Sequence, residues 1–266
     1  MGEFGDEAIT LPEGRVGHHA QMDEVFDRLF RAGREAVLDG AVQAQEPPRV
    51  NGPRWGTSIV LRPEAAGTDR VHALAFEALA ATGSGHWPTG ARGSAHITVR
   101  AVEPHRTPIP ADDPAAARYL SALRRAAARC PSIRFRVRGL TLTANSVMLC
   151  LGPEDGCADE FAGALARTLG ADGWLEADHP RDVWYLTLVH FAGPIDRPEA
   201  LVDWVAARRR LDLGGLDVDR AELVAWRFDG VRVVPDVLGA VGMRTPGAGA
   251  APAPDGSGRG PHRDGR

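Results

Sequence analysis

Two segments of this sequence place a threonine two positions after a side chain that can exchange a proton. The first is HITV, from His96 to Val99, and the second is YLTL, from Tyr185 to Leu188. Histidine titrates near neutral pH, so it can accept a proton in one step of a reaction and donate it in another. A phenol, with a pKa of about 10, can donate a proton but is a poor base at pH 7. The two segments are therefore candidates for the two halves of one acid–base site.

The alternation of side chains along a β-strand decides which of these residues can share a site. His96 and Thr98 lie on one face of the first strand, and Tyr185 and Thr187 lie on one face of the second. Strict alternation places His190 on the opposite face of the second strand. His190 therefore cannot stand in for a histidine beside Thr187 unless a β-bulge intervenes.

The elements around the two segments alternate between strand and helix patterns. Alternating or continuous apolar residues predict strands at 55–63, 95–103, 133–143, 146–152, 183–191, 219–228 and 230–238. Helical spacing of apolar residues predicts helices at 22–40, 69–83, 112–130, 159–170 and 197–211. Asp113 is the predicted N-cap of the third helix, with Pro114 at its first position. Two successive blocks of strands and helices of this kind predict an α+β fold.

The chain divides into three regions by composition. Residues 1–52 form an extension with one helix and a linker, and residues 244–266 form a tail rich in Gly, Pro, Ala and Arg that we expect to be disordered. Residues 53–243 form the main domain, in two lobes at roughly 53–130 and 131–243 that may exchange strands.

With one such motif per lobe, the chain resembles the 2H phosphoesterase superfamily, which includes the 2′-5′ RNA ligase-like proteins and cyclic phosphodiesterases. That family carries two H-x-[ST]-hydrophobic motifs, which HITV matches fully and YLTL matches except for its histidine. The resemblance implies a two-lobed, pseudo-twofold α+β fold, with antiparallel sheets lining a central cleft and helices outside. It also implies a metal-independent phosphodiesterase without cofactors, acting on a 2′,3′-cyclic phosphate or a related diester of a small nucleotide or RNA end.

The resemblance assigns roles to the four motif residues. His96 would be the general acid or base, and Thr98 and Thr187 would hold the phosphate oxygens. Tyr185 occupies the second catalytic place, where it would protonate the leaving oxygen or donate a hydrogen bond to the phosphate. Loss of one partner of an acid–base pair costs about 10²–10⁴-fold in rate. The alternative function is therefore a non-catalytic or repurposed protein that binds a phosphorylated nucleotide or metabolite.

Three further residues are candidates for substrate binding. Arg100 shares the face of His96 by alternation, Arg136 lies in a row of arginines on one strand face, and His86 lies in a loop before the first motif. Each also has a structural interpretation, because solvated arginines on a sheet face are common. His96 and Tyr185 could likewise be ordinary strand residues.

Composition excludes several classes of function. The formal net charge of −4 does not favour binding of double-stranded DNA, which requires a strongly basic face. All 31 basic residues are arginine, so no lysine Schiff base and no phosphate-loop lysine can form. The 3 cysteines lack metal-ligand spacing, and we predict no metal site. We find no apolar run long enough to cross a membrane and no signal peptide, and we expect a cytoplasmic protein. The oligomeric state stays open.

Overall fold

The computed structural model describes residues 13–52, 54–177 and 183–243, with only the backbone described for residues 13–21. The helices are α1 (Glu13–Leu38), α2 (Ala65–Thr82), α3 (Pro114–Ala127), α4 (Cys157–Leu169) and α5 (Pro198–Ala206), and a 3-10 helix, η1, spans Gly170–Glu176. The strands are β1 (Ser58–Pro63), β2 (Ile97–Ala101), β3 (Ile133–Thr143), β4 (Ser146–Pro153), β5 (Trp184–His190), β6 (Gly215–Phe228) and β7 (Val233–Gly242). The tail predicted to be disordered lies outside the described residues.

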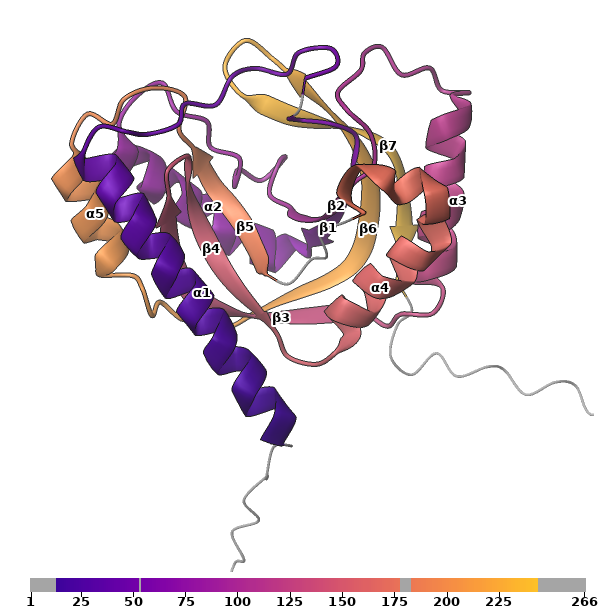
Figure 1. Ribbon diagram of the computed structural model, residues 1–266, viewed down its shortest axis with the longest axis horizontal. Coiled ribbons are helices and arrows are strands. Elements are labelled where there is room, and N and C mark those ends of the chain that lie inside the picture. Colours follow the sequence, from indigo (N-terminus) through magenta and orange to yellow (C-terminus); the bar gives the residue numbers. More distant parts are fainter. Residues whose placement is uncertain (1–12, 53, 178–182, 244–266) are drawn as a thin grey trace, which may run out of the picture.

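The strands form one antiparallel sheet that curves into a half-barrel (Figure 1). Its order is β2-β1-β6-β3-β4-β5, and β7 pairs with β6. β6 is long enough to pair with β3 at its start, with β1 further along and with β7 over its second half. A strand from the second half of the chain thus joins the two halves into one sheet. The predicted α+β architecture, with antiparallel strands inside and helices outside, is confirmed.

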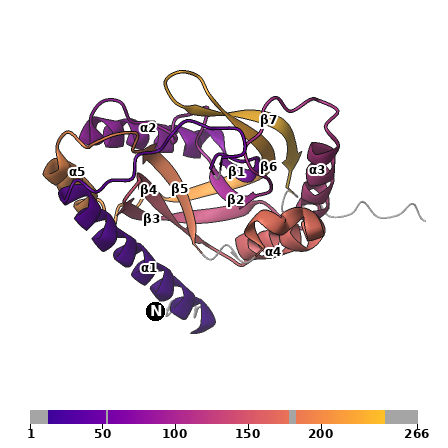
Figure 2. The same ribbon diagram turned by 45° about the horizontal axis from the view of Figure 1, so that its top comes forward.

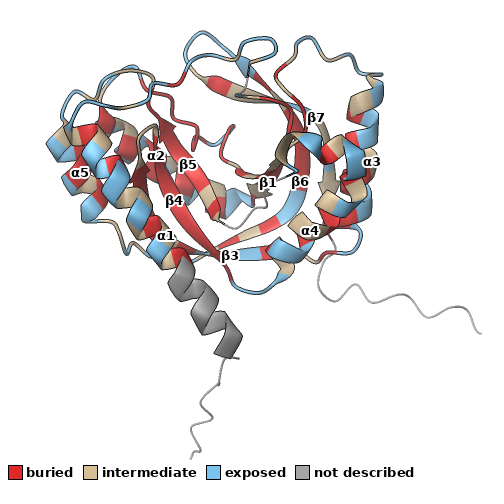
Figure 3. Cartoon of the chain, viewed as in Figure 1, coloured by how far each residue is buried: buried red, intermediate tan, exposed pale blue. Residues whose placement is uncertain are grey.

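The helices cover the outside of the half-barrel in two groups. Figures 1 and 2 show α2 and α5 together on one side and α3 and α4 together on the other. Burial of apolar side chains between these helices and the sheet stabilises the fold. Figure 3 shows that buried residues follow the strands, whereas the outer faces of the helices are exposed. Helix α3 begins as predicted, because Asp113 accepts a hydrogen bond from the backbone N–H of Ala116 and Pro114 occupies the first turn.

Helix α1 lies on the inner face of the sheet. In the β4–β5 ladder Cys150 is paired with Tyr185, and side chains paired in this way point to the same face. Cys150 packs in a buried cluster with Met22 and Phe26 of α1. The helix therefore fills part of the concave side, and the segment that follows it, from residue 39, runs along the upper edge of the half-barrel in Figure 1.

Candidate active site

A cavity of about 180 Å³ opens between β2 and β5 on the inner face of the sheet. We call it the histidine cavity, because two imidazoles line it. Its lining includes His96, which immediately precedes β2, Thr98 of β2, Tyr185, Thr187 and His190 of β5, Trp226 of β6, and Arg54 and Trp55 from the segment before β1. The structure thus brings the four predicted motif residues together and adds a second histidine that strict alternation did not place there.

The segment before β2 brings the two edge strands of the sheet together. Trp87 and His190 exchange backbone hydrogen bonds of 3.0 and 2.9 Å, and the N–H of Gly90 donates to the carbonyl of Leu188 at 2.9 Å. A Cβ atom on Gly90 would lie 2.9 Å from the Cβ of Ala75 and 3.1 Å from the Cα of Leu188, so glycine permits this close approach. Because residues 87–90 lead into β2, this pairing sets β2 opposite β5.

A β-bulge follows the threonine in each motif strand. On β5, Thr187 pairs with Met148 and Val189 pairs with the adjacent Val147, so Leu188 is the extra residue. The bulge reverses the alternation beyond Thr187, which turns Val189 into the core and His190 into the cavity. The expectation that His190 lies on the face opposite Thr187 is therefore wrong. A β-bulge lies between the two residues, which is the exception that the sequence analysis allowed.

The same irregularity on β2 removes Arg100 from the site. Thr98 pairs with Val60 and Arg100 pairs with the adjacent Ile59, which leaves Val99 as the extra residue. Arg100 then points away from the cavity, and its guanidinium donates to the carbonyl of Gly173 at 2.8 Å. Ala101, three residues after Thr98, faces the cavity instead. It holds the position on β2 that His190 holds on β5, three residues after Thr187.

The hydrogen bond of His96 fixes its tautomer. Its Nδ1 lies 2.7 Å from the carbonyl oxygen of Ser94, which can only accept, so Nδ1 carries the hydrogen. The neutral ring then has its lone pair on Nε2, the nitrogen that a ligand in the cavity can use. Arg62 holds the preceding loop, because its guanidinium donates to the carbonyls of Ala95 at 2.6 Å and Gly93 at 2.9 Å.

His190 is held through Thr89. The hydroxyl of Thr89 donates to the carbonyl oxygen of Thr187 at 3.2 Å, and its oxygen lies 3.0 Å from Nδ1 of His190. Since the one hydroxyl hydrogen is used on the carbonyl, Nδ1–H of His190 is the donor in the second bond. His190 therefore also has its lone pair on Nε2 when neutral. The two imidazoles have the same tautomer, assigned from their neighbours.

Both imidazoles are poor proton acceptors in the free protein. The pKa of His96 is lowered to about 4, chiefly by burial; the bond to Ser94 opposes this shift, and the charge of Arg62 contributes to it. Burial also lowers the pKa of His190 to about 3, and the charges of Arg54 and His96 act in the same direction. Both rings are therefore neutral at pH 7, and an anion bound between them would raise the pKa of each.

Three tryptophans enclose the two imidazoles. The ring of Trp226 lies 4.6 Å from that of His96, and the ring of Trp55 lies 5.0 Å from that of His190 in an edge-on arrangement. Trp55 also lies 6.0 Å from both Trp87 and Trp226. These apolar walls account for the desolvation that lowers both pKa values.

Arg54 supplies a cationic group at this cavity. It lines the cavity and forms no ion pair or hydrogen bond with any residue that the structure describes. Arg62, by contrast, is engaged by two carbonyls and lies 3.3 Å from the carboxylate of Glu222. An arginine that forms no ion pair with the described residues can bind the oxygens of an anionic ligand.

Two other predicted binding residues lie away from this cavity. His86 is buried, and its Nδ1 accepts a hydrogen bond of 3.1 Å from the N–H of Ala192. Arg136 is exposed and pairs with Asp212 at 2.6 Å, on a sheet face open to water. Their neighbours explain both positions without a ligand.

The described residues form neither a metal site nor a membrane-spanning helix. In residues 13–52, 54–177 and 183–243, no group of three or more His, Cys, Asp or Glu side chains is placed to hold a metal ion. Within the same ranges, no helix combines the length and the apolarity needed to traverse a lipid bilayer.

Comparison with known proteins places the fold. No protein-family profile and no curated protein matches the chain. TT0787 of Thermus thermophilus matches with a TM-score of 0.50 and 20% identity, over 71% of this chain and 98% of that one. E. coli LigT, solved with 3′-AMP, matches with a TM-score of 0.51 and 14% identity, over 74% and 99%. This chain shares the fold of TT0787 and E. coli LigT.

Three residues of the histidine cavity, His190, Arg54 and Trp55, are not predicted as site residues from the sequence. Strict alternation excludes His190, because no local feature of the sequence indicates a bulge inside this apolar strand. Arg54 and Trp55 come from the segment between α1 and β1; the sequence places Trp55 at the start of a predicted strand and assigns no role to Arg54. Trp55 does carry a structural sign, because its φ of 63° is unusual for a bulky residue. Such strain often marks functional positions.

Proposed function

We propose that this chain is a phosphodiesterase that hydrolyses a 2′,3′-cyclic phosphate or a related diester of a nucleotide or RNA end, without a metal ion. The observation that carries the proposal is the pair of imidazoles, His96 and His190, that line one cavity with Nε2 as the usable nitrogen of each. The shared fold and the binding of 3′-AMP by E. coli LigT support the choice of substrate class.

The two histidines would divide the proton transfers. Binding of the anionic diester raises the pKa of the pair, so the complex takes up one proton from solvent. The neutral imidazole accepts a proton from water as its oxygen attacks phosphorus. The imidazolium donates its proton to the ribose oxygen as the P–O bond breaks, and one water is consumed for each monoester formed.

The remaining cavity groups would stabilise the phosphorane. Thr98 and Thr187 would donate hydrogen bonds to non-bridging oxygens, and Arg54 would offset the negative charge that develops there. In this proposal Tyr185 no longer has to replace a histidine. Its hydroxyl would orient the phosphate from the same strand face as Thr187.

The competing function is binding without turnover. Its supporting observation is that the pKa values of both imidazoles, at about 4 and about 3, leave neither ring protonated in the free protein at pH 7. A bound ligand that did not raise these pKa values would lie between two neutral imidazoles, with no imidazolium to act as the acid. Such a cavity would hold a phosphorylated nucleotide or metabolite through its hydroxyls and Arg54.

Turnover of a panel of 2′,3′-cyclic nucleotides and short RNAs ending in a cyclic phosphate, in EDTA, tests the proposal. The wild type should form a monoester, and His96→Asn should lower kcat by about 10²–10⁴-fold. Asparagine is the informative replacement, because its amide can still donate to Ser94 while Nε2 is lost.

Two results separate the alternatives. Tight binding of the panel with no product at high protein concentration would reject the enzyme and favour the binding protein. Equal turnover by the wild type and a correctly folded His96→Asn variant would show that the product arises elsewhere, from another site or a contaminant.

A further inference from the structure

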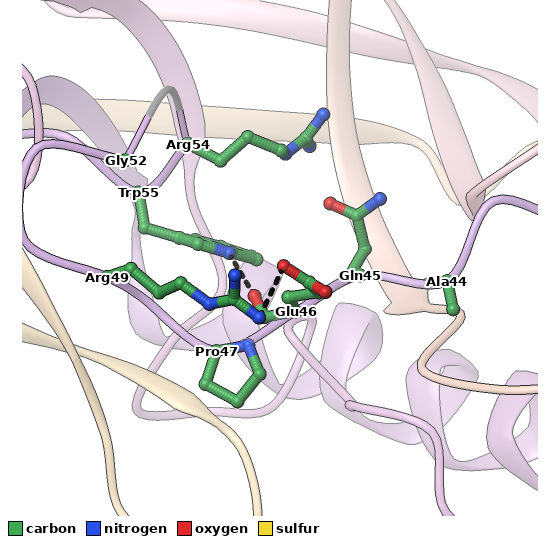
Figure 4. A pocket seen from close by; sticks show the side chains of 8 residues that line it. All are labelled: Ala44, Gln45, Glu46, Pro47, Arg49, Gly52, Arg54 and Trp55. Carbon is green, nitrogen blue, oxygen red and sulfur yellow. Dashed lines mark hydrogen bonds and ion pairs between the residues drawn. The ribbon is translucent and has the colours of Figure 1, made fainter.

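A second cavity, of about 260 Å³, is drawn in Figure 4. It has two lining residues in common with the histidine cavity. We call it the Gln45 cavity. Its lining comes from the segment between α1 and β1: Ala44, Gln45, Glu46, Pro47, Arg49, Gly52, Arg54 and Trp55. Arg54 and Trp55 line both cavities, so the two cavities are neighbours.

Gln45 presents an unused acceptor in this cavity. Its side chain is buried, with 7% of the residue surface exposed, and its Oε1 has no hydrogen-bond partner among the described residues. The backbone N–H of Gln45 donates to the carbonyl of Phe191 at 2.6 Å, which ties the residue to the end of β5 beside His190. A buried acceptor without a donor costs about 1–3 kcal/mol, so a ligand that supplies an N–H would be favoured here.

The orientation of the Gln45 amide is set by its neighbour. Its Nε2 lies 3.4 Å from the carbonyl oxygen of Gln43, which can only accept. The amino end of the side chain is therefore directed at this carbonyl, and the oxygen is left for the cavity, as Figure 4 shows.

Trp55 forms a rigid wall between the two cavities. Its indole N–H donates to the carbonyl of Glu46 at 3.1 Å, and its own carbonyl accepts from Nδ1 of His105 at 3.1 Å. These bonds hold Trp55 in its left-handed backbone conformation. An indole fixed in this way offers a planar apolar surface on which an aromatic ring can stack.

We propose that the Gln45 cavity binds the base of the nucleotide, stacked on Trp55, with an N–H of the base donating to Oε1 of Gln45. The phosphate would then lie between the imidazoles, with Arg54 between the two parts of the ligand. The inference rests on the proposed function for the position of the phosphate. It adds that the protein selects bases that present an N–H donor and discriminates against ligands that lack one.

Equilibrium binding of monoester products tests the inference without requiring turnover. Isothermal titration would compare adenosine 3′-phosphate with purine riboside 3′-phosphate, which lacks the amino group, and with ribose 3-phosphate, which lacks the base. We expect adenosine 3′-phosphate to bind about tenfold or more tightly than purine riboside 3′-phosphate, because it satisfies the buried acceptor. Ribose 3-phosphate should bind more weakly still.

Two variants locate the effect. Gln45→Leu should reduce the ratio of the two purine affinities to near one. Gln43→Leu is the matched control, because Gln43 is exposed and contributes only its backbone carbonyl, and it should keep the ratio. A wild-type ratio near one, a ratio kept in Gln45→Leu, or no binding of any of the three ligands would overturn the inference.

The binding results also separate this inference from the proposed function. A base preference that depends on Gln45, in a protein that hydrolyses no cyclic phosphate, would retain the subsite and reject the enzyme. Hydrolysis of cyclic phosphates without any preference among the three monoesters would retain the enzyme and reject the subsite.

Discussion

His96 and His190 are held by different neighbours but offer the same ring nitrogen to the cavity. A backbone carbonyl holds the first and a threonine hydroxyl holds the second. Burial, to which the neighbouring indole rings contribute, keeps both imidazoles neutral at pH 7 in the free protein. The chemistry at this site therefore depends on how far a bound ligand raises two depressed pKa values.

Binding of inorganic phosphate should strengthen as the pH falls from about 7.5 to about 5.5. The free imidazoles have pKa values of about 4 and about 3, and the bound anion raises them, so the complex holds more protons than the free protein does. Titration in buffers of different ionisation enthalpy should show uptake of about one proton. Phosphate itself gains protons over this range, so the His96→Asn variant is the control, and it should show less uptake.

The stability of the free protein should have the opposite dependence on pH. A histidine whose pKa is depressed by folding binds fewer protons in the folded state than in the unfolded state. The free energy of unfolding is therefore expected to decrease as the pH falls from about 6.5 toward 4. Phosphate at saturating concentration should offset part of this loss.

The irregular strands, rather than the motifs alone, assemble the site. A bulge after Thr98 turns Arg100 outward to Gly173, and a bulge after Thr187 turns His190 inward. The segment from Trp87 to Gly90 supports the second bulge by pairing with the end of β5. Thr89 is the side chain in this segment that reaches His190.

Thr89→Val should disturb catalysis more than stability. Valine keeps the shape but removes the hydroxyl that positions Nδ1 of His190, so we expect kcat to fall about tenfold or more with a smaller change in KM. The loss of the hydroxyl should cost about 1 kcal/mol of stability. The pH profile of kcat should also shift, because the imidazole of His190 loses the hydroxyl that holds its Nδ1–H.

Thr82→Val is the matched control for this experiment. Thr82 is also fully buried, but its hydroxyl donates to helix carbonyls of Ala78 and Leu79, away from the cavity. Its cost in stability should be similar and its kcat unchanged. A similar kcat for both variants would show that Thr89 stabilises the fold but does not position His190 for catalysis.

These elements also show which features can be read from the sequence. Alternation places His96 and Thr98 together and buries Ile97, because β2 is regular up to Thr98. It fails for Arg100 and His190, because the two bulges arise in the pairing of β2 with β1 and of β5 with β4, which is long-range information. The α+β class and the cap of α3 follow from local patterns and are confirmed.

In the molecule as a whole, the N-terminal helix and the segment after it complete the concave face. Helix α1 packs on β3 and β4, and the following segment delivers Gln45, Arg54 and Trp55 to the cavities. Arg138 of β3 pairs with Asp23 of α1 at 2.8 Å, and the hydroxyl of Thr141 donates to the carbonyl of Phe26 at 2.9 Å. Gln45, in the region expected to be an extension, thus lines the Gln45 cavity next to the histidine cavity.

Gly33→Ala should test how tightly this helix determines the site. A Cβ atom at Gly33 would lie 2.5 Å from the carbonyl carbon of Leu142, so the helix must shift away from the β3–β4 turn. We expect a loss of about 1–3 kcal/mol in the free energy of unfolding, by analogy with overpacked cores. Nucleotide affinity should fall with it, because Gln45 and Trp55 follow this helix.

Ala32→Ser, on the exposed face of the same helix, is the control and should change neither quantity by much. If Gly33→Ala lowers stability but leaves nucleotide affinity intact, the segment after α1 is positioned independently of the helix.

The central claim is that His190, and not Tyr185, is the proton-transfer partner of His96. The decisive measurement is kcat/KM in EDTA for His190→Asn and Tyr185→Phe, on the cyclic nucleotide that the wild type hydrolyses fastest. Asparagine retains a donor toward Thr89 while removing Nε2, and phenylalanine removes only the hydroxyl. We predict a loss of about 10²–10⁴-fold for His190→Asn and less than about tenfold for Tyr185→Phe. The reverse order would contradict the account and return the second catalytic role to Tyr185.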